Sequence, residues 1–298
     1  MTTNAPAPPR PEDTAVSAAP GFIAVDELAA LVQRQQPVLL LDARFTLEEG
    51  PLPGEYRAGH IPGAVFVDLA RELSGPQQPS VGSYPVPQAA DFERTARSWG
   101  LDDGTDVVAY AGYTGISAGR LSWLLRWFGH RRVRILDGGL QAWQRRGYPL
   151  VADGAPAAKA GHFSARPGGA PVVDAPSALE LGRQGQLIDV RARSQYRLRE
   201  PDPDRGAYFP GRIPGAVNVP STSFHRRNGR LRSAGEIAAM LTEAGVDPGR
   251  PVAVYCGGGV ASAWAAFALR AVGVDAALFT ASWSEYVADP GLPVELEP

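Results

Sequence analysis

The residue with the clearest chemical potential is Cys256, the single cysteine of the 298-residue chain. It follows the apolar run 252–255 and precedes the glycine run 257–259, after which a helix pattern begins near Ser262. Because glycines have no Cβ, the N–H groups of such a loop can turn toward one point and hold an anion. A helix N-terminus aimed at the same point favours a thiolate or a persulfide anion. The active-site loop predicted in this way consists of Gly257, Gly258, Gly259, Val260 and Ala261.

Two other interpretations of this segment compete with a nucleophilic cysteine. A free cysteine is most often a small, inert residue of the core. The strand end, the glycine loop and the helix start each favour reactivity instead. Glycine loops also bind phosphate, but the Gly-x-x-x-x-Gly-Lys-Ser/Thr pattern is absent. We therefore expect thiol chemistry rather than a nucleotide site, and we predict neither a metal nor a cofactor.

The elements that must position Cys256 occur twice in the chain. Three signals recur in the same order, which is typical of a tandem duplication. The first is an apolar run ending in Asp-x-Arg, at 38–44 and 187–191. The second is Ile-Pro-Gly-Ala-Val, at 61–65 and 213–217. The third is an apolar run ending in Tyr, at 107–110 and 252–255.

The domain organisation follows from this repeat. Residues 1–20 are rich in Pro and Ala and predict a disordered tail. We place an N-terminal domain at 21–150, a linker at 151–170 and a C-terminal domain at 171–298. Short apolar runs without strict alternation, separated by helix patterns, predict an α/β fold with a mainly parallel sheet flanked by helices on both faces of each domain.

Two helix starts can be predicted within this fold. One helix begins near Ser117, and its apolar stripe consists of Leu121, Leu124, Leu125 and Phe128. Another begins at the capping box Ser233–Glu236. Ligands of parallel sheets bind at the carboxyl ends of the strands, so chemistry is expected after Tyr110 and Tyr255.

Composition excludes several classes of function. The chain has 29 Lys and Arg against 31 Asp and Glu and a pI near 6.1, which disfavours binding to nucleic acid or anionic membranes. We predict no membrane-spanning segment and no secretory leader. A lone cysteine fits a reducing compartment, so we predict a cytoplasmic protein.

These motifs together resemble the tandem-domain sulfurtransferases of the rhodanese superfamily, which includes thiosulfate and 3-mercaptopyruvate sulfurtransferases. The resemblance covers about residues 21–298. It implies two rhodanese-like domains, an inactive first copy with Ala111 at the place of the thiol, and a Cys256 that accepts a sulfane sulfur and passes it on. The motifs that carry it are Leu-Asp-Ala-Arg at 41–44, Gly-His-Ile-Pro-Gly-Ala at 59–64, Leu-Asp-Gly-Gly at 136–139, Ile-Pro-Gly-Ala at 213–216 and the loop 256–261.

The loop also bears on the sulfur donor. Relatives specialised for thiosulfate place basic side chains after the cysteine, whereas 3-mercaptopyruvate-type relatives have a neutral glycine-rich loop. The uncharged run 257–259 therefore favours 3-mercaptopyruvate over thiosulfate. The chain departs from that pattern at Gly258 and Ala261, where relatives carry hydroxyl side chains.

The resemblance further implies the residues that bind the donor. Two arginines of the second domain clamp the donor carboxylate in 3-mercaptopyruvate-type relatives. One matches Arg205, and the other falls on the neutral Gln195. Four arginines nearby in the sequence can replace it, namely Arg191, Arg193, Arg197 and Arg199. His60 matches the cleft histidine of the family and is expected to face Cys256.

Other residues of the repeated motifs are predicted to hold the fold. Asp42, Arg44 and Asp189 lie at strand ends in both copies, although only one copy has the thiol. Trp283 matches a tryptophan in a Ser-Trp-Ser-Glu-Trp stretch of the family, and we predict that it lines or supports the cleft wall.

The predicted function is a sulfurtransferase that works through a Cys256 persulfide. The acceptors implied are cyanide, a small thiol or thioredoxin. An alternative is a non-catalytic sulfur carrier or regulatory binding module, since Gln195, Gly258 and Ala261 depart from the family pattern. A thiol phosphatase or arsenate reductase is weakened by the short loop, which has no arginine.

Overall fold

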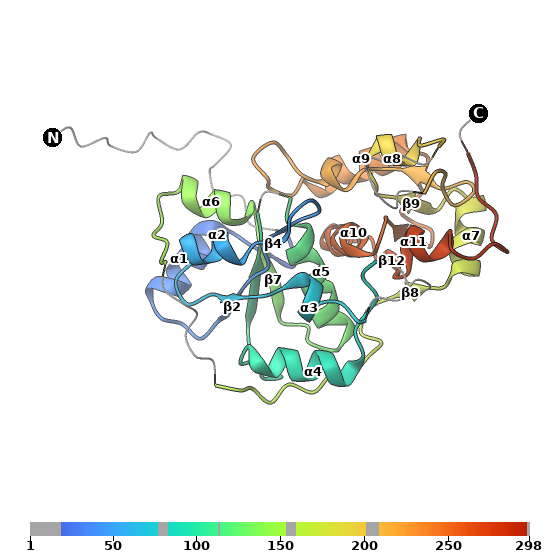
Figure 1. The fold of residues 1–298 in the computed structure, drawn as a ribbon. Helices are drawn as coiled ribbons and strands as arrows, with labels where there is room; N and C mark the ends of the chain where they lie inside the picture. Colours follow the sequence, from blue (N-terminus) through green and yellow to red (C-terminus); the bar gives the residue numbers. More distant parts are fainter. Residues whose placement is uncertain (1–18, 77–82, 113, 153–158, 201–208, 297–298) are drawn as a thin grey trace.

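The computed structural model describes residues 19–76, 83–112, 114–152, 159–200 and 209–296 (Figure 1). The predicted tail, apart from its last two residues, lies outside the described residues. Arg205 lies outside them as well.

The N-terminal half contains a parallel five-stranded sheet in the order β1-β7-β6-β2-β5. A short antiparallel pair, β3 and β4, stands beside it. The strands are β1 (Phe22–Ile23), β2 (Leu39–Asp42), β3 (Phe45–Thr46), β4 (Gly50–Pro51), β5 (Val65–Phe66), β6 (Val107–Tyr110) and β7 (Val133–Leu136). The helices are α1 (Val25–Gln33), α2 (Pro53–Ala58), α3 (Leu69–Glu72), α4 (Ala89–Ser98), α5 (Ile116–Trp127) and α6 (Gly139–Arg145).

The C-terminal half repeats this sheet with the order β8-β12-β11-β9-β10, again all parallel. The strands are β8 (Val172–Val173), β9 (Leu187–Asp189), β10 (Val217–Asn218), β11 (Ala253–Tyr255) and β12 (Ala277–Phe279). The helices are α7 (Ala175–Arg183), α8 (Arg193–Tyr196), α9 (Ala234–Glu243), α10 (Val260–Ala271) and α11 (Ser282–Tyr286), with a 3-10 turn at Ser221–Phe224.

Equivalent hydrogen bonds recur in the two halves, as a duplicated fold requires. The Tyr56 hydroxyl donates to the Ala64 carbonyl over 2.6 Å, and the Tyr196 hydroxyl donates to the Ala216 carbonyl over 2.7 Å. The phenol oxygen of Tyr255 accepts from the Ile213 N–H, as that of Tyr110 does from Ile61. The predicted α/β architecture with two mainly parallel sheets is confirmed.

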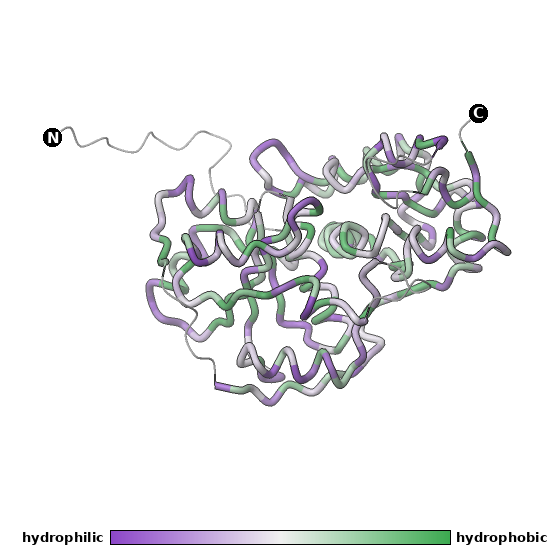
Figure 2. The backbone as a smooth tube through the Cα atoms, in the orientation of Figure 1, coloured by the Kyte–Doolittle hydropathy of each residue, from purple (hydrophilic) through white to green (hydrophobic). Residues whose placement is uncertain are grey.

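Each sheet packs against two cores, because successive side chains of a strand point to opposite faces. In β11, Val254 belongs to a core shared by both halves, whereas Ala253 and Tyr255 face a second core on the outer side of the C-terminal sheet. The N-terminal sheet has an outer core of its own, which contains Val108 and Tyr110. Figure 2 shows the hydrophobic segments, including α10, gathered in the interior.

The two halves meet along α5 and α10, which lie side by side (Figure 1). Gly119 of α5 makes the close approach possible, since a Cβ at this position would lie 2.5 Å from the Cα of Trp264. No helix within the described residues has the length and apolarity needed to cross a bilayer.

The predicted helix starts are close to the observed ones, with one correction. The first begins at Ile116, and α9 has the capping box of Ser233 and Glu236. The helix after the glycine loop begins at Val260 rather than near Ser262, so Val260 and Ala261 form its first turn. This helix has no N-cap side chain, because Gly259 occupies the N-cap position in a left-handed conformation with φ 89°.

Candidate active site

Cys256 follows β11 directly and continues its alternation. Its side chain is therefore on the face of Val254, toward the shared core, and it is buried. Its carbonyl accepts the N–H of Trp283, and the carbonyl of Gly257 accepts the N–H of Ser284. The turn after β12 thus ties down the backbone on which the thiol is held.

Two donors point at the sulfur. The Gly259 N–H donates to Cys256 Sγ over 3.1 Å, and the Ser262 hydroxyl donates over 3.3 Å. Both come from the start of α10, whose N-terminus carries positive partial charge. Sequence reasoning missed Ser262, although this hydroxyl residue lies at the predicted start of the helix. Its hydroxyl compensates for those that Gly258 and Ala261 lack.

Ser282 is held in a strained backbone conformation beside the thiol. Its φ of 58° is left-handed, and Gly139 stands at the equivalent position of the first half with φ 60°. The Ser282 hydroxyl accepts the Cys256 N–H over 3.3 Å and lies 3.5 Å from the Ser262 hydroxyl. Such strain persists where the surroundings over-determine it, commonly at functional sites.

The absence of a side chain at position 258 has a packing reason. A Cβ on Gly258 would lie 2.8 Å from the Cβ of Ser83 and 3.3 Å from the ring of Tyr84. These residues belong to the N-terminal half, and the Ser83 N–H also donates to the Ser284 hydroxyl over 3.2 Å. The first half therefore covers the loop of the second, and a side chain of the relatives' kind would collide with that cover.

Arg120 of α5 is a second residue that sequence reasoning missed. It is fully buried, and its Nη1 donates to the carbonyl of Gly259 over 3.4 Å. The available signal was a charged residue within a helix of apolar pattern, four positions before Leu124. The loop of the C-terminal half thus receives a cation from the N-terminal half.

Asp42, Arg44 and Asp189 hold the fold, as their positions predicted. The Arg44 guanidinium donates to Asp42 over 2.8 Å and to the Gly59 carbonyl over 2.8 Å. Arg191 makes the equivalent contacts with Asp189 and the Gly211 carbonyl. Both pairs are buried and fix the motif that follows the strand.

Trp283 packs against Arg191. The Arg191 guanidinium lies 4.9 Å from the centre of its ring, and the indole N–H donates to the Phe209 carbonyl over 3.0 Å. The side chain is buried, which agrees with a supporting role.

His60 lies buried within the N-terminal half. Its ring stacks on Tyr56 at 3.9 Å, and its Nδ1 lies 2.8 Å from the Tyr56 carbonyl. The equivalent Arg212 stacks on Tyr196 in the same way, at 4.5 Å. A contact present in both halves belongs to the fold, so the expectation that His60 touches substrate stays a prediction.

The predicted donor-binding residues are not brought together at the thiol by the described contacts. Gln195 lies in α8, half-buried, and its side-chain oxygen accepts the Ala192 N–H over 3.3 Å. Arg197 follows α8 and is exposed. Arg191 is committed to Asp189, which removes it from the arginines that can replace Gln195.

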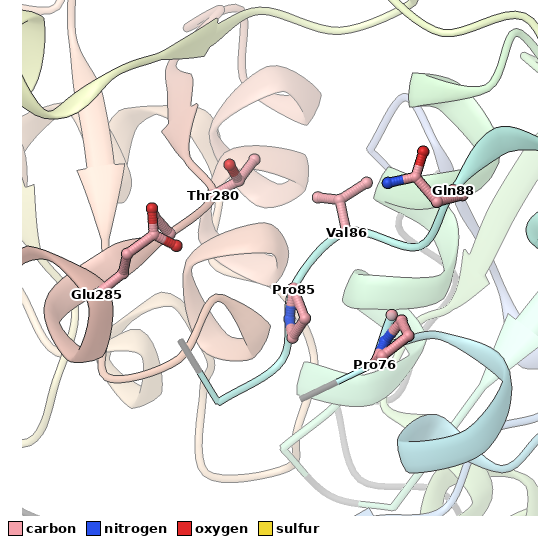
Figure 3. Close-up of a pocket in the computed structure, with 8 residues that line it drawn as sticks. Pro76, Pro85, Val86, Gln88, Thr280 and Glu285 are labelled. Carbon is pink, nitrogen blue, oxygen red and sulfur yellow. The ribbon is translucent and has the colours of Figure 1, made fainter. Parts of the chain in front are cut away.

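A cavity of about 390 Å³ lies where the two halves meet, beside the turn that follows β12 (Figure 3). Thr280, Ala281 and Glu285 form one wall, and Pro85, Val86 and Gln88 form part of the other. Burial raises the pKa of Glu285. Cys256 does not line this cavity.

Comparison with known proteins decides the family. The model of the rhodanese-like domain matches residues 24–146 and again 174–289. The chain belongs to the rhodanese family. Both copies of the repeat are therefore rhodanese domains, and the fold expected from the motifs is confirmed.

Similar proteins of this rhodanese family cover nearly the whole chain. SseB of Mycobacterium tuberculosis, which bears the name of a thiosulfate sulfurtransferase, is 37% identical over 92% of this chain and 96% of its own. The 3-mercaptopyruvate sulfurtransferase of Escherichia coli strain K12 is 34% identical over 92% of this chain and 97% of its own. The crystal structure of SseA from Escherichia coli matches with a TM-score of 0.76 and 32% identity, covering 88% of this chain and 98% of that one.

The rhodanese relatives also decide between the classes of function. Their shared activity over almost the full length makes this chain a sulfurtransferase, and the alternative of a non-catalytic binding module is not favoured.

Proposed function

We propose that the protein transfers sulfur through a persulfide on Cys256. The observation that carries this proposal is the sulfur itself, which accepts the Gly259 N–H and the Ser262 hydroxyl at the N-terminus of α10. Donors aimed at a sulfur favour its anionic state, both as thiolate and as persulfide. The same contacts can hold the charge before and after transfer.

The proposed reaction has two steps. The Cys256 thiolate attacks the sulfane sulfur of the donor, a sulfur–sulfur bond forms, and the bond between that sulfur and the rest of the donor breaks. With 3-mercaptopyruvate the leaving group is pyruvate, whose methyl carbon takes the proton of the donor thiol. With thiosulfate it is sulfite. In the second step a nucleophile such as cyanide takes the outer sulfur, and the Cys256 thiolate returns.

We favour 3-mercaptopyruvate as donor over thiosulfate. The loop 257–259 is uncharged, and a Cβ on Gly257 would meet nothing within 4 Å, so this position has room that no basic side chain occupies. Arg205, Arg197, Gln195 and His60 remain the residues proposed to bind the donor.

The remaining expectations extend this proposal. We propose a small thiol or thioredoxin as acceptor besides cyanide, a cytoplasmic location on the strength of the lone cysteine, and domains at 21–150 and 171–298.

Intact-mass measurement tests the reaction and the donor together. The protein and its Cys256→Ser variant are incubated with 3-mercaptopyruvate or with thiosulfate and then with cyanide. We expect one added sulfur in the unaltered protein with 3-mercaptopyruvate, its loss on cyanide addition, and none in Cys256→Ser. Loading by thiosulfate alone would reverse the donor assignment, and no loading by either would refute the proposed reaction.

A further inference from the structure

Arg120 is a buried cation that has no part in the two steps of the proposed reaction. Its Nη2 donates to the carbonyls of Leu73, Tyr84 and Pro85 over 3.2, 3.0 and 3.2 Å. Its Nη1 reaches across to Gly259, and its buried Nε has no hydrogen-bond partner within the described part of the chain. The guanidinium therefore bridges two segments: residues 83–85 of the first half, which cover the loop 256–259, and that loop of the second half, which is called the thiol loop below.

This cation has no carboxylate partner among the described residues. Each acceptor it contacts is a neutral carbonyl oxygen, whereas the buried arginines Arg44 and Arg191 are each paired with an aspartate. An unpaired buried charge is costly, so buried charges are normally paired. Burial lowers the pKa of Arg120 to about 10, and the charge of Cys256 opposes that shift. Arg120 is therefore still protonated at neutral pH.

The relation between the two halves shows that this charge is specific to the thiol loop. Gly115 and Gly259 cap α5 and α10 in the same left-handed conformation. A Cβ on Gly115 would lie 3.6 Å from the Trp264 ring of α10, and one on Gly259 would lie 3.7 Å from Nη1 of Arg120. Each helix thus sends one side chain to the loop of the other half, and the thiol loop receives the cation.

We infer that Arg120 is a positioning residue for sulfur transfer and the counterion of the Cys256 anion. It holds the carbonyl of Gly259, the residue whose N–H points at the sulfur. It also places positive charge beside the thiolate and the persulfide. This inference rests on the proposed function for its persulfide stage. Its thiolate stage requires no sulfur donor.

Other charged groups around the thiol do not replace Arg120. Arg191 also acts on the charge of Cys256, but its own charge is compensated by Asp189. His225 stacks on Trp264 on the side of the other loop, and burial lowers its pKa to about 4, so it is neutral at pH 7.

The test is the rate of Cys256 alkylation by iodoacetamide between pH 5 and 9, in the full chain and in Arg120→Met. Loss of a nearby charge should move the midpoint of the pH–rate profile upward by about one unit or more, and the rate at pH 7 should fall about tenfold. Arg120→Lys keeps the charge and should restore most of the shift. Arg126→Met, in the same helix but remote from the loop, should leave the profile unchanged.

Two outcomes decide the inference. An unchanged midpoint in folded Arg120→Met would overturn it, as would a shift of equal size in Arg120→Lys. If Arg120→Met does not fold, Arg120→Gln gives the same readout, because its amide can still donate to the Gly259 carbonyl. Sulfur loading of the unaltered protein is measured separately by mass. If the unaltered protein loads no sulfur but Arg120→Met shifts the pH–rate profile, the proposed reaction is refuted and the role of Arg120 as counterion stands.

Discussion

The loop after β6 and the loop after β11 are two versions of one strand–loop–helix unit. In the first, Ala111 follows the strand and the Gly115 N–H donates to the Gly112 carbonyl over 3.1 Å. In the second, Cys256 follows the strand, the loop is one residue shorter, and the equivalent N–H of Gly259 points at the sulfur. The N–H at the start of the helix is thus bound to a loop carbonyl in the first half and to the cysteine sulfur in the second.

The surroundings of the two loops differ as much as the loops. The thiol loop is covered by Ser83 and Tyr84 and receives Arg120, whereas the other loop receives Trp264 with His225 stacked on it. The half without the thiol therefore contributes a cation and a cover to the half with it. Residues of both halves therefore form the surroundings of Cys256.

The largest effect is expected when the thiol is removed from the second loop and a thiol is introduced into the first. Cys256→Ser should lower sulfur transfer at least about a thousandfold, because no other thiol exists. Adding Ala111→Cys to that variant should not restore activity, since its loop lacks both the aimed N–H and the cation. Cyanide-dependent thiocyanate formation measures both. Recovery of more than a few percent would mean that the two loops are equivalent.

The uncharged environment of the first loop can be tested through His225. Burial lowers its pKa to about 4, while the unfolded chain has the ordinary value near 6.5. The unfolded state therefore binds more protons between these values, and stability falls as pH drops from 6.5 toward 4, by about 2–3 kcal/mol. In His225→Phe, which keeps the stack on Trp264, this loss should disappear from urea unfolding at pH 4.5 compared with pH 7. An equal loss in the variant would mean that His225 does not titrate this way.

The close contact between α5 and α10 can be tested at Gly119. Gly119→Ala places a Cβ 2.5 Å from the Trp264 backbone and should cost about 1–3 kcal/mol in the free energy of unfolding. Gly235→Ala, in α9 with open space around it, is the matched control and should be neutral or slightly stabilising. Similar values for the two variants in urea titrations would contradict the close approach.

The smallest effect is expected from the hydroxyl beside the sulfur. Ser262→Ala removes one hydrogen bond to an anion, and sulfur transfer should slow about tenfold. Ser117→Ala is the control from α5, because its buried hydroxyl has no partner within the described residues. Equal rates in the two variants would remove Ser262 from the site.

The position of Cys256 could be predicted because its signals are local. A strand run, a thiol, glycines and a helix follow one another within a dozen residues, and the repeat identified the fold. Arg120 and Ser83 could not be found in this way. Arg120 approaches the loop through the packing of α5 against α10, and Ser83 approaches it from the segment before α4. Contacts between residues so far apart in the chain produce no recognisable spacing in the sequence.

The hydroxyl donors illustrate a second limit of sequence reasoning. The sequence shows that Gly258 and Ala261 lack the hydroxyl donors that relatives carry at these two positions. Ser262 supplies one from the next position along the helix, within the first turn of α10, which starts two residues earlier than predicted. A shift of this size is ordinary for a predicted helix boundary.

The shared core has a consequence for how the molecule comes apart. Val107 and Phe128 from the first half lie in one continuous apolar cluster with Val254 and Leu278 from the second. Separating the halves would expose that cluster to water before either sheet is disrupted, which makes a half-unfolded state expensive. Despite its two rhodanese domains, the chain should melt as a single cooperative unit, with equal calorimetric and van't Hoff enthalpies.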